Sequence, residues 1–280
     1  MSNYREAPEL EHQVVWLIGA TSGIGEALVH QLADHCGQLV ISGRSEDKLD
    51  QLTCKYTRIS SIVADVTDLA SMKKAAGYIE EGFGRIDTVI INAGTCEYLD
   101  VQNFDSALVK RVIDTNLMGM VHCIEAALPL LRKSQRGYLV GVASSVTYLA
   151  LPRAQAYGAS KAGVRYLLES MRADLANEQI DVSVVSPGFV KTPLTDRNDF
   201  EMPMRISAEQ AAEAIVDGIE DRPWDIHFPK RFTLLLKLMG ALPAWLRLAI
   251  SRKTSTNKPE QRSDDRQRSN KPMTNKEANG

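Results

Sequence analysis

The sequence predicts a single α/β domain built on a doubly wound parallel sheet, with a helical extension near its carboxyl end. Short runs rich in β-branched residues alternate with helical stretches, which is typical of β–α–β units. The runs are apolar throughout rather than at every second residue, as expected for strands covered on both faces. With 280 residues, 44% of them hydrophobic, and no internal repeat, the chain can form one large core.

The expected strands and helices alternate along the chain. Strands are expected at residues 14–18, 38–42, 59–64, 87–91, 139–143, 182–185 and 225–228. Helices are expected up to about residue 35 and at residues 46–55, 69–82, 104–132, 155–177 and 207–220. Residues 187–205 contain three prolines and no clear period, so they are expected to form a loop.

The charge of the chain is unevenly distributed. The formal net charge of −2 does not favour nucleic acid as a partner, yet residues 230–280 contain 12 lysines and arginines against 4 acidic residues. From Ser251 the chain is polar and has almost no large apolar residues, so residues 251–280 are expected to be a disordered basic tail. The catalytic unit would then be residues 1–250. The tail is either merely solvated or makes a surface contact.

The cysteines and the first residues favour a cytoplasmic protein without a metal site. Cys36, Cys54, Cys96 and Cys123 form no CxxC pair and no metal-like spacing with the five histidines. They are expected to be reduced thiols. The amino-terminal residues are polar and lack the apolar segment of a secretory signal.

A glycine-rich turn comes after the first expected strand and opens the first expected helix. Its glycines are Gly19, Gly23 and Gly25. Glycines let a backbone turn tightly and approach a pyrophosphate, and the helix amino terminus offers free N–H groups to the anion. The turn therefore indicates a dinucleotide site, although a purely structural turn remains an alternative.

Further markers occur farther along the chain, in a fixed order. They are Asp65-Val66, Asn92-Ala93-Gly94, Asn116, Ser144, Tyr157-Gly-Ala-Ser-Lys161, and Pro187-Gly188 with Val190 and Thr192. With the GxxxGxG turn, they make residues 14–193 resemble the short-chain dehydrogenase/reductase family, whose fold is a Rossmann-type sheet. One departure is Ile18, since the family usually has threonine before the first glycine.

The resemblance implies a set of cofactor-binding residues. It comprises Gly19, Thr21, Ser22, Gly23, Ile24, Gly25, Arg44, Asp65, Val66, Asn92, Ala93, Gly94, Tyr157, Lys161, Pro187, Gly188, Val190 and Thr192. In such enzymes the residues after the third strand contact adenine. The loop that contains the Pro-Gly pair binds the nicotinamide carboxamide, with the threonine hydroxyl nearby, and begins the substrate loop.

The end of the second strand favours NADP(H), with NAD(H) possible. An NAD-selecting enzyme places a carboxylate there for the ribose 2′-hydroxyl, whereas this chain has Gly43 followed by Arg44. A guanidinium can bind a 2′-phosphate through two hydrogen bonds, and Thr21 and Ser22 can add hydroxyl contacts. Alternatively, Arg44 only stacks on adenine or caps the next helix.

Tyr157 and Lys161 lie four residues apart, so they share one face of the expected helix. A phenol with a pKa of about 10 transfers protons poorly at neutral pH, and a nearby ammonium is expected to lower that pKa. The tyrosine can then exchange a proton with a carbonyl oxygen or an alcohol.

Two more residues complete the catalytic set that the resemblance implies. Ser144 has the family's spacing to the tyrosine and would hydrogen-bond the same substrate oxygen; Ser145 is adjacent, and either serine can instead satisfy loop backbone. Asn116 would mark a local break in its helix and orient a water towards Lys161, giving a proton relay to Tyr157.

The expected activity is reversible hydride transfer between NADP(H) and a small, hydrophobic carbonyl compound or secondary alcohol, in a homodimer or homotetramer. Two alternatives are a non-catalytic NADPH-binding redox sensor and a membrane-surface adaptor. The intact Ser144, Tyr157 and Lys161 set argues against a sensor, which needs no acid.

The segment Phe232–Ile250 is strongly apolar but is interrupted by Lys237, Pro243 and Arg247, so it is not expected to span a membrane. It fits an interfacial helix, giving peripheral membrane contact through residues 230–253. Trp245 and the flanking cations Lys230, Arg231, Arg252 and Lys253 would lie at headgroup level. A helix over the substrate cleft or in a dimer interface is the alternative.

Overall fold

The computed structural model describes residues 8–196 and 202–254 of the chain. Its centre is a sheet of seven strands, in the order β3-β2-β1-β4-β5-β6-β7, and every neighbouring pair is parallel. The strands are β1 (Val14–Ile18), β2 (Gln38–Gly43), β3 (Ile59–Val63), β4 (Thr88–Ile91), β5 (Gly137–Val142), β6 (Ile180–Pro187) and β7 (Asp225–Phe228). The doubly wound Rossmann-type fold predicted from the sequence is confirmed.

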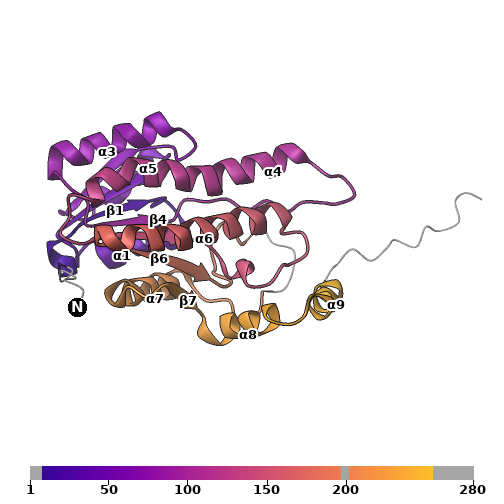
Figure 1. Ribbon diagram of the computed structural model, residues 1–280. Helices are drawn as coiled ribbons and strands as arrows, with labels where there is room; N and C mark the ends of the chain where they lie inside the picture. The colour runs from indigo at the N-terminus through magenta and orange to yellow at the C-terminus, as the bar shows by residue number, and fades with distance from the viewer. Residues whose placement is uncertain (1–7, 197–201, 255–280) are drawn as a thin grey trace, which may run out of the picture.

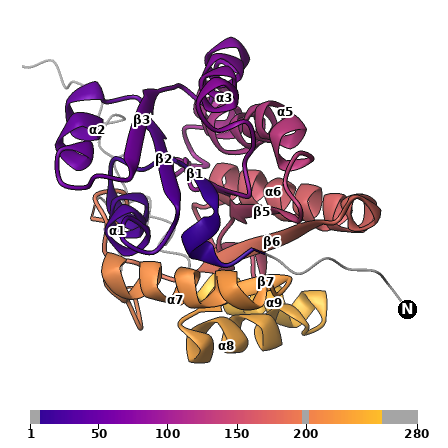
Figure 2. The ribbon, with the colours of Figure 1, turned by 90° about the vertical axis from the view of Figure 1, so that its left-hand side faces the viewer.

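Helices cover both faces of the sheet (Figures 1 and 2). The helices of one face are α1 (Gly23–Leu32), α2 (Glu46–Thr53) and α7 (Ala208–Asp221). Those of the other face are α3 (Leu69–Phe83), α5 (Gly119–Leu131) and α6 (Gln155–Leu175), with α4 (Ser106–Ile113) preceding α5. Each face therefore has its own apolar core.

Strand β1 shows why the strands are apolar at every position. Val14, Trp16 and Ile18 pack into the core beneath α3, α5 and α6. Val15 and Leu17 point the other way, into the core beneath α1, α2 and α7. Successive residues of a strand point to opposite faces of the sheet, so a strand that is covered by helices on both faces has no polar side.

The single helix expected at residues 104–132 is divided into three parts. Helices α4 and α5 are joined by a π-helical segment, Asp114–Met118, which contains Asn116. A π-helical turn accommodates one extra residue and is frequent at functional sites. The local break expected at Asn116 is thus present, although the helix continues through it.

The apolar carboxyl-terminal segment also forms two helices rather than one. Helix α8 (Lys230–Gly240) and helix α9 (Ala244–Thr254) are separated at Pro243, because the residue before a proline is disfavoured in helical conformation. Both lie at the edge of the molecule beyond β7 (Figures 1 and 2). Among the described residues, no helix is long and apolar enough to cross a bilayer. Of the expected tail 251–280, residues 255–280 lie outside the described part.

Asp87, immediately before β4, fixes the start of two neighbouring strands. The side chain is 1% exposed, and its Oδ2 accepts a hydrogen bond of 2.8 Å from the backbone N–H of Val14. Arg85 and Ser134 donate to the same carboxylate, from 3.0 and 2.5 Å. The carboxylate therefore satisfies a buried backbone donor and is itself satisfied by two side chains.

We expect Asp87→Ala to lower the free energy of unfolding by about 1–3 kcal/mol, because the N–H of Val14 is left buried without an acceptor. Arg85→Ala is the matched comparison: the Arg85 side chain is 43% exposed and that of Asp87 only 2%, and the variant keeps the hydrogen bonds that Val14 and Ser134 donate to the carboxylate, so its loss of stability should be smaller. Chemical denaturation of both variants measures the difference. An Asp87 variant as stable as the Arg85 variant would contradict this role.

Candidate active site

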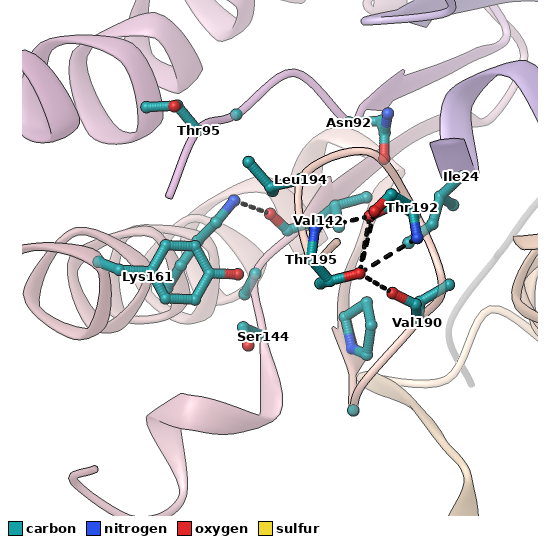
Figure 3. A pocket seen from close by; sticks show the side chains of 15 residues that line it. Ile24, Asn92, Thr95, Val142, Ser144, Lys161, Val190, Thr192, Leu194 and Thr195 are labelled. Carbon is teal, nitrogen blue, oxygen red and sulfur yellow. Dashed lines mark hydrogen bonds between the residues drawn. The ribbon is translucent and has the colours of Figure 1, made fainter. Parts of the chain in front are cut away.

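A crevice opens at the carboxyl ends of β1 and β4, where the direction of the strand order reverses. Open α/β sheets bind ligands at such a switch point. The crevice has a volume of about 110 Å³ (Figure 3). It is lined by Ile24, Asn92, Gly94, Thr95, Val142, Ala143, Ser144, Tyr157, Lys161, Pro187, Gly188, Val190, Thr192, Leu194 and Thr195.

The glycine turn leaves no room for side chains. Gly19 has φ +86°, and a Cβ there would lie 2.6 Å from the backbone nitrogen of Ala93. A Cβ on Gly25 would lie 1.9 Å from the carbonyl oxygen of Gly19. Helix α1 begins at Gly23, after Ser22. The turn thus brings bare backbone and a helix amino terminus to the crevice, an arrangement that suits a pyrophosphate.

The end of β2 lies beside this turn. A Cβ on Gly43 would lie 2.7 Å from the Cγ2 of Thr21, so a carboxylate at position 43 would need Thr21 to move. Arg44 and Ser22 are exposed. Burial opposes ionisation of Asp65, but hydrogen bonds from Thr67 and the charge of Arg44 keep its pKa below the ordinary value. Val66, the other expected adenine contact, is buried.

The loop after β4 links the glycine turn to helix α6. The Asn92 side chain donates a 2.9 Å hydrogen bond to the carbonyl of Gly19. A Cβ on Gly94 would lie 3.1 Å from the Oδ1 of Asn116 and 3.3 Å from the Nζ of Lys161. The absence of a side chain at position 94 therefore lets this backbone pass over both groups.

Asn116 joins three parts of the site. It is 1% exposed; its Oδ1 accepts from the N–H of Thr95 at 2.7 Å, and its Nδ2 donates to the carbonyl of Thr95 at 2.9 Å. Nδ2 also donates to the hydroxyl of Ser160, 2.9 Å away, and Ser160 donates to the carbonyl of Tyr157. The π-helical turn thus holds both the loop after β4 and helix α6.

Lys161 is buried within the crevice wall. Its side chain comes from α6 and donates a 2.7 Å hydrogen bond to the carbonyl of Val142, at the end of β5 (Figure 3). Burial lowers the pKa of Lys161 to about 8. The amine can therefore change its charge near neutral pH.

Tyr157 precedes Lys161 by one turn, and its pKa differs from the expectation. Burial raises the pKa of Tyr157 to about 12, although hydrogen bonding with Ser144 acts in the opposite direction. The lowering expected from the charge of Lys161 is not found, and burial sets the direction of the shift. The phenol is thus protonated at neutral pH.

Ser144 and Ser145 lie in different surroundings. Ser144 caps a short 3₁₀ turn after β5, and its Oγ accepts from the N–H of Val146 at 3.2 Å. It lines the crevice together with Tyr157, whereas Ser145 does not. The geometry brings Ser144, rather than its neighbour, to the crevice.

The loop after β6 covers the glycine turn. A Cβ on Gly23 would lie 2.9 Å from the Cγ2 of Thr192, so the two segments are in contact. The backbone N–H of Thr192 donates to the hydroxyl of Thr195 at 3.1 Å, and that hydroxyl donates to the carbonyl of Val190 at 2.5 Å. Thr195 therefore fixes the conformation of this loop.

A second, larger cavity adjoins the crevice, with a volume of about 580 Å³. Ser144, Tyr157, Gly188, Leu194 and Thr195 line both. The larger cavity is mostly apolar, and its wall includes Cys96, Tyr98, Leu149, Phe189, Phe232, Leu236, Met239 and Ile250. The inner face of α8 therefore forms part of this cavity wall, in agreement with the alternative that places the carboxyl-terminal segment over a cleft.

Sequence reasoning missed several residues of the site. Thr95, Ser160 and Thr195 carry its hydrogen bonds, and Cys96 and Tyr98 line its larger cavity. Ser160 lies inside the Tyr-Gly-Ala-Ser-Lys run, so its position next to the lysine was the available signal. The others lie in irregular loops, where no periodicity indicates which side chains turn inward.

Comparisons with known proteins fit this geometry. A family model described as short chain dehydrogenase matches residues 13–202. An uncharacterised oxidoreductase of Staphylococcus epidermidis is 30% identical over 209 residues, or 74% of this chain and 91% of the relative. Dehydrogenase/reductase SDR family member 7B of Xenopus tropicalis is 31% identical over 205 residues, or 70% of this chain and 66% of the relative.

Two solved structures share the fold. A short-chain dehydrogenase of Burkholderia cenocepacia in complex with NADP superposes with a TM-score of 0.76 at 23% identity, covering 89% of this chain and 100% of that one. A short-chain dehydrogenase/reductase of Burkholderia phymatum in complex with NAD also has a TM-score of 0.76, at 22% identity, covering 90% and 99%.

The chain belongs to the short-chain dehydrogenase/reductase family. It is therefore an oxidoreductase that uses a nicotinamide dinucleotide and acts on small carbonyl or alcohol substrates. The glycine turn, the bare backbone at Gly94 and the buried amine of Lys161 fit that cofactor.

The pKa of Lys161 predicts how the cofactor affinity of this dehydrogenase depends on pH. Its pKa is about 8 in the free protein, and an anionic dinucleotide favours the charged amine, so binding raises that pKa. Affinity should be greatest below pH 8 and should fall as the pH rises through 8. Fluorescence titration with NADPH and NADH from pH 6.5 to 9.5 measures the two affinities. The Lys161→Met variant should lose the pH dependence of both affinities. Parallel pH profiles for both proteins would refute the prediction.

Proposed function

We propose that this dehydrogenase is an NADP(H)-preferring oxidoreductase that interconverts a ketone or aldehyde and an alcohol on a hydrophobic substrate. Tyr157 is its general acid and base, and Ser144, Lys161 and Asn116 assist. The observation that carries the proposal is that Tyr157 and Ser144 line both the crevice and the large apolar cavity. A substrate oxygen held by these hydroxyls would therefore lie between the cofactor site and the substrate site.

The proton chemistry depends on the charges of the site. The nicotinamide supplies or accepts the hydride. Because burial raises the pKa of Tyr157 to about 12, the phenol holds its proton at neutral pH and can donate it to a carbonyl oxygen. The hydroxyl of Ser144 holds the same oxygen as negative charge develops. In the alcohol-oxidising direction, a positive charge on Lys161 would stabilise the phenolate.

Asn116 supports this set through the backbone. Its hydrogen bonds to Thr95 and Ser160 hold the loop after β4 and the first turn of α6 in a fixed relation. We propose that this arrangement keeps the Lys161 amine in reach of a solvent-derived proton.

The preference for NADP(H) rests on the end of β2. An acidic side chain at position 43 would displace Thr21, and Arg44 is exposed beside the glycine turn. A guanidinium there suits a 2′-phosphate. The two Burkholderia structures contain NADP and NAD respectively, so the fold accepts either cofactor.

The large cavity supports a hydrophobic substrate. Its volume of about 580 Å³ lies within the range of pockets for drug-sized ligands. Its wall is mostly apolar, and the hydroxyls of Ser144, Tyr157 and Thr195 lie where it meets the crevice. We further propose a homodimer or homotetramer in the cytoplasm. The alternatives of a redox sensor or an adaptor gain no support from relatives that are described as oxidoreductases.

We expect Tyr157→Phe to lower turnover at least about 100-fold, because the ring stays and the acidic proton is lost. Cofactor affinity should change little. Turnover is measured with NADPH and a panel of aldehydes, ketones and 3-keto acyl compounds, after titration confirms that the variant binds NADPH. Near-normal turnover would remove Tyr157 from the mechanism.

We expect Arg44→Ala to weaken NADPH binding about tenfold or more and to leave NADH binding unchanged, since only NADPH carries the 2′-phosphate. Lys48→Ala is the control, because Lys48 is an exposed cation on the adjoining helix α2. Dissociation constants for both cofactors decide the matter. An unchanged NADPH/NADH ratio would show that Arg44 does not read the phosphate.

A further inference from the structure

Helix α8 has an inner face that is held firmly against the domain. Phe232 and Leu236 are buried and line the large cavity. At its end, a Cβ on Gly240 would lie 2.0 Å from the carbonyl oxygen of Tyr148, so backbone packs directly on backbone. The inner face is therefore accounted for by the fold and the cavity.

Lys237, the cation in the middle of α8, also points inward. Its Nζ lies 3.0 Å from the Oδ2 of Asp225, which has a side-chain exposure of 9%. Tyr148 and Arg165 donate to the same oxygen, at 2.7 and 3.1 Å. Burial opposes ionisation, but the hydrogen bonds from Tyr148, Arg165 and Lys237 keep the pKa of Asp225 below its ordinary value. The charge that interrupts the apolar segment in the sequence is thus absent from the outer face of the helix.

Helices α8 and α9 carry five exposed large hydrophobic side chains, called here the apolar stripe: Leu234, Leu235, Leu238, Trp245 and Leu248. These side chains are 50%, 48%, 70%, 70% and 52% exposed. Along the described residues, eleven large hydrophobic side chains are at least 48% exposed, and five of them fall within fifteen residues here. Single exposed hydrophobic residues are ordinary, whereas such a concentration on two successive helices indicates an interaction surface.

The charges around the stripe have one sign. Between Asp225 and Glu260 the sequence has seven lysines and arginines and no acidic residue. Lys230 and Arg231 lie exposed at one end of the stripe, and Arg247 and Arg252 are exposed on α9. The surface therefore complements a partner that is both apolar and anionic.

Residues 255–280 have few side chains that could cover the stripe. The only side chains among residues 255–280 from the hydrophobic set are Met273 and Ala278. The same residues carry six lysines and arginines against four acidic residues. The end of the chain thus adds positive charge and few apolar groups.

We propose that the outer face of α8 and α9 docks on the headgroup layer of an anionic phospholipid bilayer. The apolar stripe enters the boundary between headgroups and acyl chains, and the flanking cations contact the anionic headgroups. Docking through this face does not depend on the catalytic roles proposed for Tyr157 and Ser144. Phe232, Leu236, Met239 and Ile250 of the same helices line the large cavity, so a docked molecule holds that cavity beside the bilayer.

The test is flotation of the full-length protein with vesicles of phosphatidylcholine alone or mixed with phosphatidylserine. We expect the protein to float with the anionic vesicles at low salt and to be released as salt screens the attraction. Leu238→Glu combined with Trp245→Glu should abolish flotation. Neither residue lines the cavity, so NADPH binding and thermal stability should be retained.

Matched variants separate the stripe from general effects. Phe104→Glu is the control for the apolar contact, because Phe104 is 66% exposed elsewhere on the molecule. Arg231→Gln should weaken partitioning about fivefold, as expected for one cation at the surface. Lys74→Gln, an exposed cation on α3, should leave partitioning unchanged.

Three outcomes would overturn the proposal. In the first, the full-length protein stays in the soluble fraction with both vesicles at low salt. In the second, the double Leu238/Trp245 variant floats as the unmodified protein does. In the third, the double variant changes an oligomer into a monomer by light scattering and no form binds vesicles, which would make the stripe a contact between copies of this chain.

Discussion

The site depends on the burial of one amine, that of Lys161, in a wall made by three separate parts of the chain. A charged amine is costly to bury unless polar groups meet it. Here the carbonyl of Val142 accepts its hydrogen bond, and the bare backbone at Gly94 lets Asn116 and the amine approach the same loop. Burial lowers the pKa of Lys161 to about 8, so its charge responds to whatever anion enters the crevice. The same burial raises the pKa of Tyr157 and keeps its proton available.

The helix that carries this amine is bound by the π-helical turn at Asn116. An uninterrupted α-helix at residues 104–132 would carry residue 116 at another angle, since one extra residue in a turn shifts the register of the helix beyond it. The turn instead directs Asn116 to Thr95 and Ser160. A local irregularity in one helix therefore positions the loop after β4 against the start of α6, and with it the pair Tyr157 and Lys161.

A second polar centre ties the substrate side to the fold. Asp225, on the edge strand β7, binds Tyr148 from the loop after Ser144, Arg165 from the catalytic helix and Lys237 from α8. Three elements that border the large cavity are thus joined through one carboxylate. Because Lys237 points inward, the exposed cations of α8 lie at its start, at Lys230 and Arg231, and its inner face forms part of the cavity wall.

The sequence by itself determined the order of strands and helices, the sheet type and the family, because these depend on local patterns. The sequence shows the apolar runs of strands that are covered by helices on both faces. It also shows the glycine turn and the spacing of Tyr157 and Lys161. It also indicated the break at Asn116, through the resemblance. Tertiary structure alone decided how burial sets the two pKa values, since desolvation depends on distant segments that meet in space. It alone decided the contacts of Ser160 and Thr195 and which way Lys237 points. The sequence shows the same lysine in an apolar run whether its side chain faces solvent or a buried carboxylate. Only the position of Asp225 in the folded protein distinguishes these two arrangements.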